Sequence, residues 1–546
     1  MIFSRTKNSD ELTFDDGQIS LDLRLAVTGH RTLPNPDEVE KAVNSALDII
    51  MELLPPAARA ASQMVAISAL ADGADRLVAK CVLMRPNGRL EVILPMAEAE
   101  YLEDFSSTDS VQEFEHLLAA ASWVATVSQM PTRNDSYEAA GRAIVDRADI
   151  TIAIWDGRDA GGKGGTAEIV RYVREYRRPL IWISAAGGEP VVENLARLTE
   201  TGWLAGLTAG ELSHLVEFNA TPVGTDQQRA PLSASIEQAF ANAGSLNAAN
   251  GLSNLLNWIQ PPLARAESLS RRFQLLYLRL SAALFALAAA AVCIASLQLV
   301  YFPHVRLVTV GEIACLLTIV GGLEWGRRRR VQQRWISARY LAERLRNAFF
   351  LALAGTEERP SAAASIFSEE PAAAWVRTAF RMVWIRRPEW NSDLVSVVVL
   401  RRFLAEAWIE DQINYFSRAS RRNRRKHRIY ARVVEGLFGA SVVVAITHVA
   451  LSGSESWFHH LLSWLSISIP TCAAALAANS AQREYLHHAQ RYDRVTDLLA
   501  EARIRMLACT NRIHLRAAAS LVDRLLREEH SDWFGTIRLH DLEIPA

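Results

Sequence analysis

Four apolar segments in the second half of the chain constrain its fold more than any other feature. Leu280–Phe302 spans 23 residues without Asp, Glu, Lys or Arg, and a second apolar run follows at Leu307–Leu323. Gly436–Ser454 and Ser456–Gln482 also lack these charged residues. A helix of about 20 apolar residues crosses the hydrocarbon core of a bilayer. The sequence therefore predicts two membrane hairpins, with spans at about 280–302, 307–325, 434–454 and 457–480.

Basic residues accumulate on one side of the predicted spans. Arg271 and Arg272 precede the first hairpin and Arg327–Arg330 follow it, whereas the two hairpin tips carry only Arg306 and Glu455. Positive residues concentrate on the cytoplasmic side of a membrane. We therefore expect a multi-pass protein of the bacterial inner (cytoplasmic) membrane, with both termini in the cytoplasm. The polar N-terminal residues include no long apolar run, so we expect no secretory signal.

The two hairpins resemble each other beyond their spans. Arg339 and Tyr340 follow the first hairpin, and Arg491 and Tyr492 follow the second at nearly the same distance. Because a unit repeated at fixed spacing indicates duplication, we interpret this region as two copies of one module. Each copy is a hairpin followed by a charged cytoplasmic helix. Two unrelated hairpins that share only their charge bias are one alternative, and buried core helices of a soluble protein are another.

Residues 23–185 alternate apolar, β-rich runs with helical stretches. Strands are expected at 23–28, 64–68, 90–94, 124–127, 150–155 and 180–184. Such alternation is typical of a parallel sheet with helices on both faces. The predicted fold class is a doubly wound α/β (Rossmann-like) N-terminal domain plus an all-α membrane region with four transmembrane helices and cytoplasmic helical extensions.

The remaining segments are assigned around these two regions. We expect a polar N-terminal tail (1–22), accessory helices and a linker (186–265), a first hairpin module (266–355), a helical connector (356–417), a second hairpin module (418–520) and a C-terminal tail (521–546). The basic clusters adjoin the apolar spans, which indicates attraction to the lipid bilayer and no direct binding of DNA or RNA. The five cysteines include no CxxC pair, so we expect no metal site.

Candidate ligand-binding residues follow several of the predicted strands, where ligands of such sheets bind. Glycine allows close approach of the backbone, arginine pairs with phosphate, and free amides at a helix start bind anions. The candidates after the first three strands are Gly29, His30, Arg31, Ser68, Asp72, Gly73, Asp75, Arg76, Pro95 and Tyr101. Structural explanations exist for single residues: a hydrogen-bonding role for His30, and a surface ion pair for Asp75 and Arg76.

A glycine-rich loop follows the fifth predicted strand. Five glycines fall within residues 157–166, between a strand and a helix. Their amides can wrap a phosphate, and Thr166 can cap the helix. The candidate residues of this loop are Asp156, Gly157, Gly161, Gly162, Lys163, Gly164, Gly165, Thr166 and Glu168. A flexible connection is the alternative for the glycines, and a favourable helix dipole is the alternative for Glu168.

Two residues stand out within the predicted spans. Glu312 is a carboxylate inside an apolar run, and such a group faces protein or water. Pro470 is expected to kink the fourth span near its middle. Both are therefore candidates for lining a pore.

The motifs of residues 23–185 resemble the SLOG superfamily, named for Smf/DprA and the LOG proteins. The resemblance rests on Val27-Thr28-Gly29-His30-Arg31, on Ser68-x-Leu70-Ala71-x-Gly73-Ala74-Asp75-Arg76, on Leu94-Pro95 with Tyr101 and Phe105, and on Gly164-Gly165-Thr166. It implies a Rossmann-like domain that binds a nucleotide or a nucleotide-derived second messenger. Some members are phosphoribohydrolases with a Gly-Gly-x-Gly-Thr-x-x-Glu motif. Here an extra glycine precedes Thr166, and one residue, not two, separates it from Glu168.

The membrane region is similar in architecture to SLATT modules, in which a membrane hairpin is followed by a cytoplasmic helix. That resemblance implies an effector of bacterial nucleotide-signalled, antiphage-type defence. The tandem arrangement of two hairpins departs from the simple one-hairpin pattern. We therefore expect a homo-oligomeric sensor–effector that binds a nucleotide ligand and opens or disrupts the inner membrane.

Two other functions remain open from the sequence. The first is a membrane-anchored enzyme that hydrolyses an N-glycosidic bond, with Glu168 or Asp156 acting on the ribose. The second is a housekeeping channel or transporter, for which no substrate-coordinating group of residues is evident in the spans. Base release from nucleotides would favour the enzyme, and constitutive flux without nucleotide would favour the channel.

Overall fold

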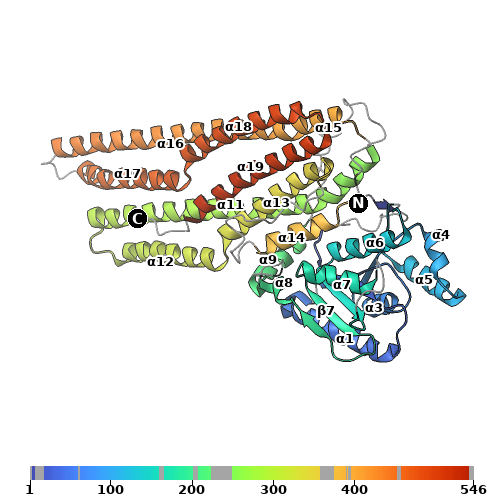
Figure 1. Ribbon diagram of the computed structural model, residues 1–546. Coiled ribbons are helices and arrows are strands. Elements are labelled where there is room, and N and C mark those ends of the chain that lie inside the picture. The colour runs from blue at the N-terminus through green and yellow to red at the C-terminus, as the bar shows by residue number, and fades with distance from the viewer. Residues whose placement is uncertain are drawn as a thin grey trace. The chain divides into compact units, whose positions relative to one another are not determined.

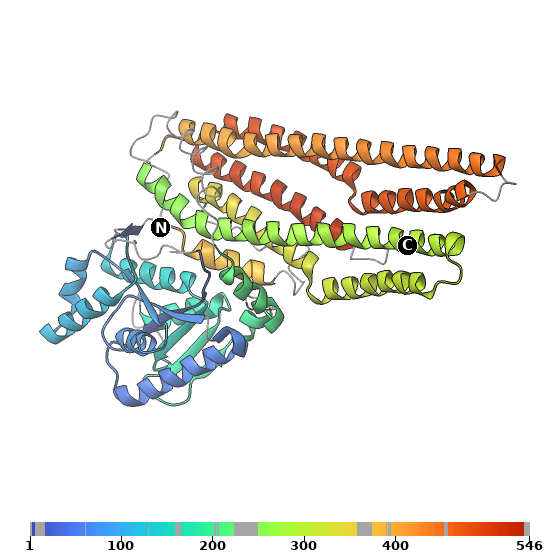
Figure 2. The same ribbon diagram turned by 180° about the vertical axis from the view of Figure 1, so that it is seen from behind.

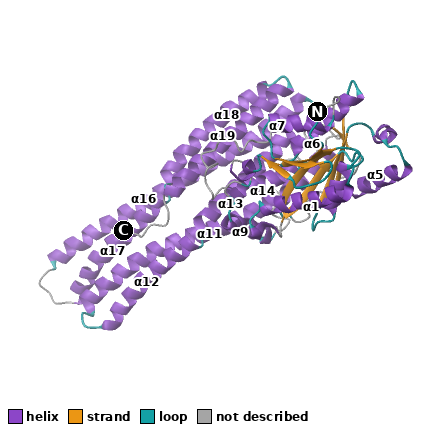
Figure 3. Ribbon diagram, turned by 60° about the horizontal axis from the view of Figure 1, so that its bottom comes forward, coloured by secondary structure: helices purple, strands orange, loops and turns teal. Residues whose placement is uncertain are grey.

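A computed structural model of the protein (Figure 1) describes residues 3–5, 17–59, 62–128, 130–158, 165–200, 204, 207–222, 249–356, 374–388, 390, 395–451 and 457–539. The chain divides into two compact units. The first comprises Met1–Ala220 with Ser368–Pro388, and the second comprises Thr221–Phe367 with Glu389–Ala546. We call them the α/β unit and the helical unit, because the described strands all belong to the first (Figure 3).

The α/β unit is built on a mostly parallel sheet, as predicted. Its eight strands run in the order β1-β5-β4-β3-β2-β6-β7-β8, and the pairings among β2 to β7 are parallel. The strands are β1 (Phe3–Arg5), β2 (Leu21–Gly29), β3 (Ser62–Ser68), β4 (Arg89–Leu94), β5 (Trp123–Val127), β6 (Ile150–Trp155), β7 (Leu180–Ser184) and β8 (Val191–Glu193). The antiparallel edge strands β1 and β8 lie outside the expected 23–185 domain.

Helices cover both faces of the sheet. The helices of this unit are α1 (Pro36–Glu52), α2 (Pro56–Arg59), α3 (Ala74–Leu83), α4 (Glu98–Tyr101), η1 (Leu102–Asp104), α5 (Thr108–Ala120), α6 (Arg133–Arg147), α7 (Thr166–Glu175), α8 (Ala196–Glu200), α9 (Ala209–Ala220) and α14 (Ala374–Ile385). α1 packs with α3, and α6 packs with α7. The central strands are buried on both faces: in β6 all six residues from Ile150 to Trp155 are buried. This explains why they read as continuous apolar runs.

The strand order reverses between β2 and β6. From β2 the chain adds β3, β4 and β5 on one side, and then β6 and β7 on the other side of β2. The connections that leave β2 and β6 therefore diverge to opposite sides. The crevice that they leave at the carboxyl ends of these strands is the usual ligand site of such sheets.

A helix from the expected connector 356–417 belongs instead to the α/β unit. Arg381 of α14 pairs with Asp149, and Arg386, directly after the helix, pairs with Asp22 at 2.6 Å. Asp22 and Asp149 lie at the amino ends of β2 and β6 and are almost completely buried. α14 also packs against α9. The sequence did not indicate this docking, because the paired charges are more than 200 residues apart.

The helical unit contains, within its described residues, four helices long and apolar enough to span a membrane, as predicted. Its helices are α11 (Ala249–Tyr301), α12 (Arg306–Arg328), α13 (Val331–Leu353), α15 (Val397–Phe403), the π-helical segment η5 (Leu404–Glu410), α16 (Asp411–Ala450), α17 (Trp457–Gln482), α18 (Tyr485–Ala508) and α19 (Arg512–Leu539). The expected boundary at residue 418 falls inside α16, and α19 occupies much of the expected C-terminal tail. No proline interrupts either helix, which accounts for both differences.

Both hairpins end in the same local geometry. After α12, Arg330 has a φ of 47° and α13 follows; after α17, Glu484 has a φ of 43° and α18 follows. A left-handed residue that is not glycine is uncommon, so its occurrence at the same point of both hairpins is an independent sign of duplication. Glu312 is half-buried on α12, and Pro470 lies inside α17.

The docking of α14 can be tested through its buried ion pairs. Removing one partner of a buried pair leaves an uncompensated charge and costs about 3–5 kcal/mol. We expect Arg386→Met to lower amide protection of β2 and α14 by at least about tenfold, or 1.4 kcal/mol, in hydrogen exchange of the full-length protein.

Lys41→Met is the control, because Lys41 and Glu38 form an exposed ion pair with side chains 73% and 58% exposed. Such pairs contribute about 0–1 kcal/mol. Equal, small effects of the two substitutions would show that α14 is not held by the Asp22 pair.

Candidate functional site

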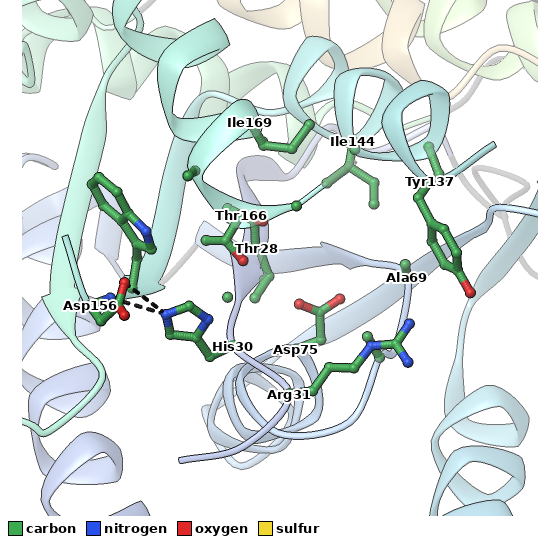
Figure 4. A pocket seen from close by; sticks show the side chains of 18 of the residues that line it. Thr28, His30, Arg31, Ala69, Asp75, Tyr137, Ile144, Asp156, Thr166 and Ile169 are labelled. Carbon is green, nitrogen blue, oxygen red and sulfur yellow. Dashed lines mark hydrogen bonds and ion pairs between the residues drawn. The ribbon is translucent and has the colours of Figure 1, made fainter. Parts of the chain in front are cut away.

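A cavity of about 440 Å³ opens at the carboxyl ends of β2 and β6 (Figure 4). It is lined by Val27, Thr28, Gly29, His30, Arg31, Ala69, Ala71, Asp75, Tyr101, Tyr137, Ala140, Gly141, Ile144, Trp155, Asp156, Arg158, Gly165, Thr166, Ala167 and Ile169. The size is within the range of pockets for small molecules. The cavity thus lies where the strand order reverses.

Gly29 ends β2 at the floor of the cavity and permits two close approaches, one to a side chain and one to backbone. A Cβ at this position would lie 2.3 Å from Ala74 Cβ and 2.8 Å from the carbonyl oxygen of Ile154. The neighbouring His30 amide donates to the Ile154 oxygen at 3.0 Å. Gly73 has a φ of +78° and lies against the backbone of Arg31. The two glycines therefore bring the β2 and β3 turns together.

Asp75 organises the turn after β3 and lines the cavity. Its carboxylate accepts a hydrogen bond from the Ser68 hydroxyl at 2.9 Å and further bonds from the amides of Ala71 and Ala69. Burial raises the pKa of Asp75 to about 6, against these hydrogen bonds. Leu70 in the same turn is fully buried with a φ of 58°. The turn is therefore stabilised by its own side chains. Ser68 does not line the cavity, but it holds the Asp75 carboxylate in place.

His30 and Asp156 form a pair at one end of the cavity. The Asp156 amide donates to His30 Nε2 at 3.2 Å, and Asp156 Oδ1 lies 3.2 Å from the same nitrogen (Figure 4). The Arg158 amide donates to Asp156 Oδ1 at 3.1 Å. This backbone hydrogen bond, with His30 and Arg158 nearby, lowers the pKa of Asp156. Asp156 therefore presents an ionised carboxylate at neutral pH.

Arg31 supplies positive charge at the opposite end. Its guanidinium carbon lies 5.6 Å from the centroid of the Tyr137 ring, and Arg31 Nη2 lies 4.0 Å from Asp104 Oδ2. The Arg31 side chain is 47% exposed, so it is free to turn toward an anion. Figure 4 shows Arg31 and Tyr137 on the side of the cavity away from His30 and Asp156. The cavity therefore has a cationic end and an anionic end.

The start of α7 forms a third wall. α7 begins at Thr166 with Gly165 as its N-cap, and Gly165 makes no side-chain cap bond. The first amides of a helix lack helical partners and favour an anion. The expected cap was Thr166, one residue further on. Gly161, Gly162, Lys163 and Gly164 lie outside the described residues.

Several predicted residues do not line the cavity. They are Ser68, Asp72, Gly73, Arg76, Pro95, Gly157 and Glu168. Arg76 is 1% exposed and donates to Ser110, Glu113 and the carbonyl oxygen of Leu70, and Asp72 pairs with it at 2.9 Å. These two side chains stabilise the turn and α5. Asp72 and Arg76 therefore do not contact a ligand in the cavity themselves.

Other lining residues escaped the sequence analysis. Tyr137, Gly141 and Ile144 lie on one face of α6, and Trp155 and Ile169 lie at the end of β6 and on α7. Thr28 and Ala71 stood within the recognised motifs but were not singled out. Helical lining residues belong to no short motif, and only their spacing of three to four residues on α6 could have indicated them.

The residues combine the start of a helix, a half-exposed arginine and buried polar groups around an apolar wall. This arrangement suits a ligand with both a phosphate and a ring. Among the described residues there is no group of three His, Cys, Asp or Glu side chains that could hold a metal ion. The sequence matches no protein-family model, and no curated protein is significantly similar to it.

The close contacts of Gly29 leave no room for a larger side chain at this position. We expect Gly29→Ala to destabilise the α/β unit by about 1–3 kcal/mol, because the added methyl overpacks a backbone contact. Gly210→Ala is the control, since its Cβ would meet only Thr208 Oγ1 at 3.7 Å. Thermal unfolding of the full-length variants measures the difference, and equal midpoints would contradict the close contact of Gly29 with Ala74 and Ile154.

Proposed function

We propose that this chain is a membrane effector of bacterial nucleotide-signalled, antiphage-type defence. Its α/β unit binds a nucleotide-derived signal, and its four spans then open or disrupt the inner membrane as an oligomer. The observation that carries the proposal is the cavity between β2 and β6 in the same chain as four membrane-spanning helices. The resemblance to SLOG and SLATT modules supports the same assignment.

The cavity suggests how such a ligand binds. A phosphate fits against Gly165, Thr166 and the first amides of α7, where the helix dipole is favourable. Arg31 pairs with a second anionic group, and the ring of the ligand lies against Tyr137 and Ile144. A ligand with two charged groups and one ring meets all three features.

Ligand-triggered leakage tests the proposal. We expect dye-loaded liposomes that contain the full-length protein to leak with one member of a panel of nucleotides, cyclic oligonucleotides and ADP-ribose derivatives. Arg31→Ala should raise the required ligand concentration at least about tenfold, because hydrogen bonds to charged groups contribute about 1.5–3 kcal/mol. Gly165→Asp should abolish the response by charge repulsion, although aspartate is a favourable N-cap residue.

Arg171→Ala is the matched control, because Arg171 is exposed on α7 and does not line the cavity. Leakage that needs no ligand would favour the housekeeping channel. A response that Arg31→Ala and Arg171→Ala weaken equally would place the ligand elsewhere.

The raised pKa of Asp75 predicts a pH dependence of binding. Above a pH of about 6 the carboxylate is charged and repels an anion, whereas below it the repulsion is lost. We expect ADP-ribose, used as an anionic probe, to bind about fivefold tighter at pH 5.5 than at pH 7.5, a difference of ~1 kcal/mol.

Asp75→Asn should remove that part of the dependence, because the asparagine carries no charge at either pH. Calorimetric titration of the full-length protein at both pH values measures the effect. The same slope in wild type and Asp75→Asn would show that Asp75 does not face the anion.

N-glycosidic hydrolysis is the second candidate, and one observation favours it. Asp156 lines the cavity with a lowered pKa, so its carboxylate could stabilise positive charge that develops on a ribose. Glu168, the other acidic candidate, does not line the cavity. Base release by the full-length protein, lost in Asp156→Asn and retained in Glu168→Ala, would put this activity first.

A further inference from the structure

The four membrane-spanning helices form a row. α12 packs against α11, α11 against α17, and α17 against α16 (Figures 1 and 2). α12 and α16 are therefore the two ends of the row. In their most apolar stretches, 11% of the residues of α12 and 0% of those of α16 are buried. α12 and α16 therefore each have one side that packs against no other span of the row, and we call these the open sides.

The two hairpins can be aligned residue by residue from their geometry. Arg330 and Glu484 mark the same left-handed turn after α12 and α17. With these two aligned, Thr309 corresponds to Ser463. Thr309 bonds to Gln298 at 3.0 Å, and Ser463 bonds to His448 at 2.9 Å, so Gln298 corresponds to His448. α11 is thus the counterpart of α16, and α12 is the counterpart of α17.

The hairpins meet along one seam, formed by α11 and α17. Ser281 bonds to Gln482 at 2.6 Å near one end, and Ser296 lies 3.5 Å from Ser468 near the other. Trp464 Nε1 also donates to the carbonyl oxygen of Cys293 at 3.0 Å. Midway between the two side-chain contacts, the register places Ala289 on α11 opposite Ala475 on α17.

This seam is heterologous, because it joins the first span of one repeat to the second span of the other. A heterologous contact joins two different surfaces, here one on the first span of a repeat and one on the second span. Because the chain contains two repeats, it has two copies of each surface. The seam uses the copy on α11 and the copy on α17. The other two copies are the open sides of α16 and α12, at the ends of the row.

The open sides carry glycine where the seam carries alanine. The alignment places Gly439 of α16 at the position of Ala289, and Gly321 of α12 at the position of Ala475. A Cβ at either glycine would meet nothing within 4 Å. Val443 on α16 and Leu317 on α12 flank them and are 63% and 67% exposed. Small residues allow helices to approach closely within a membrane, where packing drives association.

We propose that α16 of one copy docks on α12 of the next, with Gly439 facing Gly321, so that copies of the chain assemble head to tail. The proposal names the interface for the oligomer that the proposed function requires, and the contact itself does not depend on the ligand. Repetition of the seam between chains gives one continuous row of helices. Such a row closes into a ring if the rotation per chain closes, and stays open otherwise.

Disulfide crosslinking in liposomes tests the contact. All five native cysteines are replaced by alanine, and Gly321→Cys and Gly439→Cys are introduced separately into two otherwise identical chains. We expect each variant alone to stay monomeric under oxidation and their mixture to give dimers. A chain with both cysteines should give a ladder of crosslinked species. An isologous contact would instead crosslink a single variant with itself and would overturn the proposal.

The matched control is Val320→Cys with Ala440→Cys, one residue along each helix from the glycines. Both positions are exposed, and the one-residue step turns each side chain by about 100° away from the contact. Because a disulfide requires Cα atoms within about 7 Å, this pair should give at least about tenfold less dimer. Equal yields from both pairs would mean random collisions in the lipid and would refute the contact.

The same liposomes separate this proposal from the proposed function. Ligand-triggered leakage without the Gly321–Gly439 crosslink would overturn the head-to-tail contact alone. The crosslink pattern without leakage by any ligand would establish the assembly and count against the effector function. Circular dichroism of each cysteine variant confirms that it is folded before oxidation.

Discussion

The absence of water in the hydrocarbon core governs the architecture of the helical unit. Backbone N–H and C=O groups must be satisfied within the segment itself, so helices that enter the membrane stay continuous through it. Some hydroxyl groups in the spans follow the same rule: Thr318, Ser441 and Thr447 donate to carbonyl oxygens of their own helices. What remains exposed is apolar surface, and a row of four helices exposes far more of it than a closed bundle.

The α/β unit is governed by burial of a parallel sheet on both faces. Because the carboxyl-terminal halves of the central strands are mostly apolar, the polar residues of the site gather in the turns beyond them. Where the strand order reverses, the turns after β2 and β6 diverge and leave the cavity. Gly29 lets the end of β2 approach Ile154 of β6 and Ala74 of α3, and Asp75 holds the neighbouring turn after β3. The geometry of the site therefore follows from the topology of the sheet.

Local patterns explain which parts of the structure could be predicted. The central strands and the four spans follow from runs of apolar residues, and the glycine turns follow from motifs directly after strands. The docking of α14 depends on Arg386 and Asp22, which no local pattern connects. The edge strands β1 and β8 are three residues long and carry no period. On α6, Tyr137 and Ile144 line the cavity, although helical residues belong to no turn motif.

The placement of α14 suggests how a small ligand could control a membrane assembly. Arg381 of α14 and Arg386 directly after it bind the amino ends of β6 and β2, the same strands whose carboxyl ends form the cavity. In the sequence α14 lies between the two hairpins, so in the proposed function a change in these strands would reach the segments that lead to both. A ligand must discriminate between two states by about 5.5 kcal/mol to move the equilibrium from 1:99 to 99:1. If the chains of the proposed head-to-tail row share one state, a coupling of about 1–3 kcal/mol per chain reaches this threshold within a few copies.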